Sequence, residues 1–205
     1  KGMGMFVSLP SLRIESISNE FLDILSKLPK SGFTIAPEAG SKRIRKLINK
    51  DMSDDEIFNT VSTVSELNWD SSKSYFMIGL PTETMEDVEA IASLAHEAVK
   101  HIKNKRCRLS VSISNFVPKP HTPFQWEAQL DWEAFNERIH KLQTLIRGKN
   151  LSMKWSDAKM SEVEGILCRG DENVSDLIYS VYSKGEIFSS WGSEMDYEKW
   201  TSSMK

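Results

Sequence analysis

Small and polar residues gather at the ends of four short apolar runs, and these residue types suit the binding of a polar ligand. The runs are MFVSL (5–9), FTIA (33–36), YFMIGL (75–80) and RLSVSISNFV (108–117). Their ends carry, in order, Ser8, Pro10 and Arg13; Pro37, Glu38, Ala39 and Gly40; Gly79, Pro81, Thr82, Glu83 and Thr84; and Asn115, Lys119 and His121. Glycine and other small residues let a ligand approach the backbone closely. We therefore predict one site built from several turns.

The apolar runs alternate with helical patterns, which is the order expected of βαβ units and a parallel sheet. We predict four parallel strands near 5–9, 33–36, 75–79 and 109–116, in sequential order, with helices on one face. In parallel α/β folds the chemistry gathers at the carboxyl ends of the strands. The four turns should therefore meet at one edge of the sheet.

The helices between the strands carry their own start signals. Ser53 is followed by three acids, which is typical of an N-cap and a first helical turn, and Thr84 is placed in the same way. Beyond residue 130 the pattern changes to a helix, the strand candidate LSMKW (151–155) and a helical tail. We therefore divide the chain into an α/β part at 1–130 and a mainly helical extension at 131–205.

Composition limits the classes of function. The chain has 205 residues, 40 % of them hydrophobic and 27 % charged, with a net charge of −3. This balance predicts a soluble globular protein without bulk affinity for duplex nucleic acid, and no segment has the length of a membrane span. Cys107 and Cys168 lie far apart, so we expect neither a disulfide framework nor a cysteine metal site. This use of cysteine is typical of a reducing compartment, and we expect a cytoplasmic location. Because the first residue is Lys1 rather than Met, we expect a segment of a longer protein.

A proline-rich loop, FVPKPHTPFQWE (116–127), follows the last of the four apolar runs. Prolines fix φ and remove backbone donors, so this loop is neither a helix nor a central strand. Two interpretations of it stay open: its aromatic residues and His121 wall the site against water, or the loop fastens the helical tail to the sheet.

The candidate site residues also have simpler interpretations. Glu38 can be a turn carboxylate paired with Lys42 or Arg43, and Arg13 can form a surface ion pair. The basic run SKRIRKLINK (41–50) is most simply the exposed face of a helix, although Lys50 at its end can reach a carboxylate or a phosphate.

Four stretches together resemble the later part of a radical S-adenosylmethionine (radical SAM) domain: SLPSLRIES, SGFTIAPEAGSKRIRKLINKDMSDDEI, YFMIGLPTETMEDVEAI and FVPKPHTPFQWEAQ. The nearest likeness is to a group of Fe–S oxidoreductases that carry a cobalamin-binding-type domain at the N-terminus. The tail SEVEGILCRGDENVSDLIYSVYSKGEIFSSW resembles the C-terminal extension of that group.

The resemblance implies the C-terminal portion of a partial (βα)6 TIM-like barrel, strands three to six, with SAM lying across the strand ends beside a [4Fe–4S] cluster. Reductive cleavage of SAM then gives a 5′-deoxyadenosyl radical that acts on the substrate. By the family pattern, Glu38 contacts SAM and Lys50 reaches its carboxylate. Gly79 and Pro81 line the adenine side, and Arg13 matches a polar position after the third strand. The resemblance assigns no catalytic side chain here.

The CxxxCxxC triplet that holds the cluster in the family is absent from this sequence. The resemblance therefore implies that this chain alone is inactive, and that an upstream part of the same protein completes the barrel and supplies the cluster. Cobalamin stays open as a further cofactor, and the substrate is a small molecule or an RNA. Two alternatives are a module that modifies tRNA and a half-barrel scaffold without catalysis.

Overall fold

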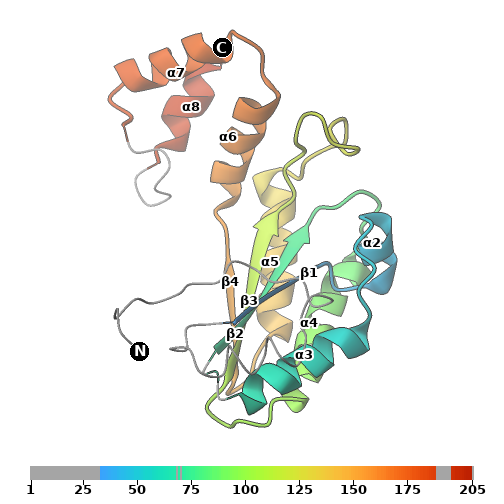
Figure 1. Ribbon diagram of the computed structural model, residues 1–205. Coiled ribbons are helices and arrows are strands. Elements are labelled where there is room, and N and C mark those ends of the chain that lie inside the picture. The colour runs from blue at the N-terminus through green and yellow to red at the C-terminus, as the bar shows by residue number, and fades with distance from the viewer. Residues whose placement is uncertain (1–32, 68, 70, 188–194, 205) are drawn as a thin grey trace, which may run out of the picture.

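The computed structural model describes residues 33–67, 69, 71–187 and 195–204. Four strands form one parallel sheet in the order β1-β2-β3-β4 (Figure 1). They are β1 (Phe33–Glu38), β2 (Ser71–Ile78), β3 (Arg108–Asn115) and β4 (Leu151–Trp155). The α/β fold predicted from the sequence is confirmed, and it is consistent with a partial TIM-like barrel.

Helices connect the strands on one side of the sheet. The connection from β1 to β2 contains α2 (Lys42–Leu47) and α3 (Asp54–Glu66), whereas α4 (Met85–Lys100) and α5 (Trp132–Leu145) form the next two crossovers. The chain ends in α6 (Ala158–Arg169), α7 (Val174–Ser183) and α8 (Tyr197–Ser203). Figure 1 shows these last three helices beyond the end of the sheet toward which β2 and β3 point.

The predicted strands at 33–36, 75–79 and 109–116 correspond to β1, β2 and β3. The predicted strand at 5–9 and the site residue Arg13 lie outside the described residues. The fourth strand of the described sheet is the candidate at 151–155, which pairs in parallel with β3. A division of the chain near residue 130 stays a prediction, although α5 and β4 continue the α/β alternation past that point.

Alternation of burial along β1, β2 and β3 locates the core. Ile35, Ile78 and Val111 are completely buried and pack with apolar residues of α3, α4 and α5. The strand positions between the buried ones are at least partly exposed. The main core therefore lies between the sheet and these helices, and the polar positions face the other way.

The predicted helix starts have the expected local chemistry. Ser53 caps α3 and forms a reciprocal capping box with Glu56. Thr84 caps α4, and its backbone N–H donates to the Asp87 carboxylate over 2.9 Å. The Ser53 side chain thus accepts from an N–H that α3 leaves unpaired at its start, and the Asp87 side chain accepts from the N-cap N–H of α4.

Candidate functional site

The first turn of the site contains an acid–base pair. Glu38 ends β1 with a φ of 69°, a left-handed conformation that redirects the chain out of the sheet. Lys50, in the segment between α2 and α3, places its Nζ 3.6 Å from Glu38 Oε1, and both side chains are about one-third exposed. Burial raises the pKa of the Glu38 carboxyl, and the positive charge of Lys50 partly offsets that effect. The structure thus brings together these two predicted site residues.

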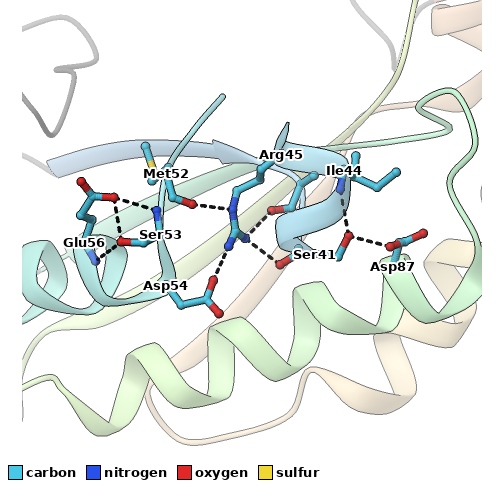
Figure 2. A network of polar contacts seen from close by, with 10 residues as sticks. Ser41, Ile44, Arg45, Met52, Ser53, Asp54, Glu56 and Asp87 are labelled. Atoms are coloured by element: carbon cyan, nitrogen blue, oxygen red, sulfur yellow. Dashed lines mark hydrogen bonds and ion pairs between the residues drawn. The ribbon is translucent and has the colours of Figure 1, made fainter. Parts of the chain in front are cut away.

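A buried arginine fixes the backbone around that pair (Figure 2). Arg45 of α2 is completely buried and donates to the carbonyl oxygens of Ala39 at 3.2 Å and Gly40 at 2.7 Å. Its Nε donates to the Met52 carbonyl over 2.9 Å, and it forms an ion pair with Asp54. The expectation that the run 41–50 is only an exposed helix face is wrong for Arg45, because its guanidinium supplies donors to three carbonyls of irregular backbone.

The second turn follows β2 and closes on itself through a carboxylate. Gly79 has a φ of 89°, and its N–H donates to Glu83 Oε2 over 2.6 Å. Burial raises the pKa of Glu83 to about 7, against the lowering effects of that hydrogen bond and of Arg138. Pro81 lies between them and is half-buried. This turn therefore places a carboxyl that can take up a proton near neutral pH beside the end of β2.

One ion pair and several hydrogen bonds join the first turn to the second. Arg43 of α2 donates to the Thr82 carbonyl over 2.8 Å and forms an ion pair with Asp87 of α4. Ser41 donates to the other oxygen of Asp87 over 2.6 Å. Burial alone would raise the pKa of Asp87, but the hydrogen bonds from Arg43, Ser41 and Thr84 lower it to about 2. Asp87 therefore stays ionised at neutral pH and holds the two turns together.

The third turn follows β3. Asn115 is buried and donates through Nδ2 to the Leu130 carbonyl over 3.0 Å. Its Oδ1 has no hydrogen-bond partner among the described residues. A Cβ at Gly79 would lie 3.2 Å from that oxygen and 2.7 Å from Leu130 Cγ. Gly79 therefore lets the turns after β2 and β3 approach closely, with an unsatisfied amide oxygen between them.

A small second core packs the three turns against each other. Its buried members are Ala39, Ile44, Leu80 and Phe116. Phe124 of the proline-rich loop packs on this cluster, with its ring 6.2 Å from that of Phe116 in an edge-to-face geometry. The loop therefore crosses the strand ends and covers the apolar contacts beneath the turns.

The same loop also contacts the helical tail. Lys119 forms an ion pair with Glu164 of α6, and its Nζ lies 3.1 Å from Cys168 Sγ. A cavity of about 520 Å³ lies between the loop and α6; its lining includes Pro120, Trp126, Ile166 and Arg169. Trp126 is 89 % exposed. These contacts favour the interpretation that the loop fastens the tail, and the packing of Phe124 is compatible with its second role at the strand ends.

Metal ligands are scarce in this part of the molecule. Among the described residues no group of three His, Cys, Asp or Glu side chains is arranged to hold a metal ion. Cys107 is buried and Cys168 is partly buried, and the chain has no other cysteine. Thiolates for an iron–sulfur cluster do not converge here. No helix of the described residues has the length and hydropathy needed to cross a membrane.

Taken together, the fold and the turns define an α/β domain of the partial TIM-like barrel class, with polar groups assembled at the carboxyl ends of parallel strands. Residues 1–95 match the family model described as the Radical SAM superfamily. Residues 1–95 are thus similar to the radical SAM superfamily, a family of enzymes that use SAM and a [4Fe–4S] cluster, and the match spans slightly less than half of the chain.

The chain is also similar to parts of several longer proteins. An uncharacterized protein of Methanocaldococcus jannaschii is 34 % identical over 182 residues, which cover 89 % of this chain and 38 % of the relative. The tRNA-2-methylthio-N(6)-dimethylallyladenosine synthase of Anaplasma marginale is 26 % identical over 152 residues, covering 73 % of this chain and 31 % of the synthase. The Ehrlichia ruminantium synthase is 28 % identical over 117 residues, covering 56 % of this chain and 24 % of the synthase. The chain thus spans well under half the length of these relatives.

Proposed function

We propose that this chain forms the SAM-binding strand ends of a radical SAM enzyme. The observation that carries the proposal is the Glu38–Lys50 ion pair, held at the carboxyl edge of a parallel sheet by the buried Arg45 network. When bound in this family, SAM and the cluster supply a 5′-deoxyadenosyl radical that abstracts hydrogen from the substrate.

The residues present suit the polar and apolar parts of SAM. The Glu38 carboxylate accepts hydrogen bonds from hydroxyl or amino groups, and the Lys50 ammonium complements a carboxylate. Gly79 and Pro81 are partly exposed at the next strand end. The unsatisfied Asn115 Oδ1 beside Gly79 is an orphaned buried acceptor, as expected where a ligand or a water completes a hydrogen bond.

The described residues do not suit the [4Fe–4S] cluster in the same way. Three of its iron atoms need cysteine thiolates, and the described residues do not bring cysteine thiolates together. We therefore assign no cluster chemistry to this chain and propose that another part of the protein supplies those ligands. A cobalamin-binding domain elsewhere in the protein, and a cytoplasmic location, are further parts of the proposal.

The decisive experiment compares the longer protein with this chain. After anaerobic reconstitution with iron and sulfide, absorbance near 400 nm and SAM binding by calorimetry are measured for both. We expect a cluster and SAM binding in the longer protein and neither in this chain alone. A cluster stoichiometric with this chain would overturn our account of its ligands. A longer protein with no CxxxCxxC segment, no cluster and no SAM binding would favour a non-catalytic half-barrel.

A second candidate is an enzyme that modifies tRNA. The observation in its favour is the similarity to several synthases named for a modified tRNA nucleoside. The net charge of −3 is unfavourable for tracking phosphates along an RNA. Mass spectrometry of tRNA nucleosides from cells with and without the gene separates the two candidates, because a missing modified nucleoside would identify the RNA enzyme.

A further inference from the structure

The face of the sheet opposite the helices is polar, and the folding of the domain does not account for it. Parallel sheets in α/β proteins are usually apolar on both faces, because both faces are covered. Here the core-facing residues alternate mostly with hydroxyl and cationic side chains along β2, β3 and β4, with Met77 as an apolar exception. The residues of this polar face used below are Thr34, Lys73, Tyr75, Ser110, Ser112 and Lys154.

The strand register arranges these residues in rows across the sheet. Lys73 pairs with Ser110, and Thr34 pairs with Lys73 from the other side. In the next row Tyr75 pairs with Ser112, which pairs with Lys154. Residues paired in register point to the same face, so both rows lie on one surface.

The two lysines are close enough to act on one ligand. They lie two strands and two residues apart, which corresponds to roughly 12 Å between their Cα atoms at usual strand spacings. A lysine side chain spans about half of that distance, so both ammonium groups can reach a point above the serines between them. One ligand of the size of a sugar phosphate therefore fits between them.

The charge on this face is uncompensated within the described part of the chain. Lys73 and Lys154 are exposed, and no described carboxylate forms an ion pair with either of them. Glu38, at the carboxyl edge of the sheet, is already paired with Lys50. Two ammonium groups with hydroxyl donors between them complement a phosphate, whose oxygens accept several hydrogen bonds at once.

We infer that this face binds a phosphorylated small molecule as the substrate, with Lys73 and Lys154 selecting for the phosphate. The inference rests on the proposed function only in calling the ligand a substrate. We call it a substrate because the strands that line this face are the same strands whose ends are proposed to hold SAM. It goes beyond that function in naming the substrate class and the residues that select it.

The test uses the full 205-residue chain, labelled with ¹⁵N, and inorganic pyrophosphate as the probe at constant ionic strength. We expect saturable chemical-shift changes at the amides of β2, β3 and β4. The double variant K73M/K154M should weaken binding by about tenfold or more, since charge-assisted hydrogen bonds are lost. Ser112→Asp, which keeps both lysines and adds a carboxylate between them, should weaken it similarly.

The matched control is Lys105→Met, an exposed lysine in the loop before β3, which should bind pyrophosphate as the wild type does. Shifts elsewhere on the molecule, or equal binding by the double variant with a native spectrum, would overturn the inference. So would a single-stranded RNA oligonucleotide that displaces pyrophosphate from these strands and binds far more tightly, because the face would then serve a nucleic acid.

SAM binding to the longer protein separates this inference from the proposed function. Lys73→Met/Lys154→Met should bind SAM normally, since neither residue lies in the three turns. Loss of pyrophosphate binding with retained SAM binding would locate the phosphate site on this face. Pyrophosphate binding by a protein that never binds SAM would uphold the phosphate site and refute the proposed function alone.

Discussion

Glu38 and Lys50 form an ion pair across 3.6 Å at the carboxyl edge of the sheet, although twelve positions separate them in the sequence. Burial raises the pKa of Glu38, so the carboxylate is held charged mainly by its neighbour. A ligand that brings its own carboxylate and hydroxyl groups can exchange partners with this pair without leaving either charge unmatched.

We predict that Glu38→Ala in the longer protein weakens SAM binding by roughly ten- to hundredfold, the value of one charge-assisted hydrogen bond of about 1.5–3 kcal/mol. Glu38→Gln keeps one acceptor and should weaken binding less, and Lys50→Met should resemble Glu38→Ala. Calorimetry measures the affinity, and a melting curve accompanies each variant. Normal SAM binding with early melting would show that the pair is structural.

Arg45→Met should be strongly destabilising. The variant leaves the carbonyls of Ala39, Gly40 and Met52 without their donor in a buried place. Breaking such a buried network costs about 3–5 kcal/mol of unfolding free energy. Urea denaturation measures the loss, and Lys46→Ala, an exposed neighbour on the same helix, should change stability by less than about 0.5 kcal/mol. A small effect at Arg45 would mean that water replaces its hydrogen bonds.

Glu83 should make stability fall as the pH rises. Its pKa is about 7 in the folded chain and 4.5 ordinarily, so between these values the folded state binds a proton that the unfolded state releases. The stabilisation is therefore present at low pH and lost as the pH passes 7. Glu83→Gln should raise the unfolding free energy at pH 8 by about 1–2 kcal/mol after allowance for solvent screening.

Urea denaturation at pH 5 and pH 8 tests this prediction. The difference in unfolding free energy between the wild type and Glu83→Gln should nearly vanish at pH 5. Glu86→Gln is the control, since Glu86 is exposed on the first turn of α4 and should give no gain at pH 8. An equal gain for both variants would point to general charge repulsion instead.

Two glycines with positive φ allow the cost of backbone strain to be measured separately from the cost of a steric clash. Gly79 and Gly185 have φ values of 89° and 84°. A Cβ added at Gly79 would collide with Leu130 and Asn115, whereas a Cβ added at Gly185 would have no atom of another residue within 4 Å, its chain neighbours aside. Gly185→Ala should therefore cost about 1 kcal/mol from backbone strain alone. Gly79→Ala should cost about 1–3 kcal/mol more because of the clash. Equal melting points for the two variants would contradict this account.

The regular elements could be predicted from the sequence because their signals are local. Short apolar runs located β1, β2 and β3, and the N-caps Ser53 and Thr84 marked two helix starts. The ion pair between Lys50 and Glu38 was not predicted: the simpler interpretation paired Glu38 with Lys42 or Arg43, and the resemblance assigned Glu38 and Lys50 each to SAM. Nothing in the spacing of two loop residues requires them to meet.

The supporting residues of the site had no such local signal. Arg45 lies in a basic run that has the pattern of an exposed helix face, and its burial depends on carbonyls of irregular backbone at either end of that run. The raised pKa of Glu83 likewise depends on how the turn after β2 folds back. Periodicity describes regular backbone, and these contacts arise where the backbone is irregular.

The sheet order also bears on how the chain reaches its folded state. Among the described residues, each strand of the sheet pairs only with its neighbours in the sequence, with one crossover between each pair. Each new strand can therefore pair with the preceding strand, which is already part of the sheet. The entropy lost in closing each loop is then only that of a single crossover. Assembly of these four strands can thus advance from one βα unit to the next, and none of the three pairings between them must wait for a distant segment.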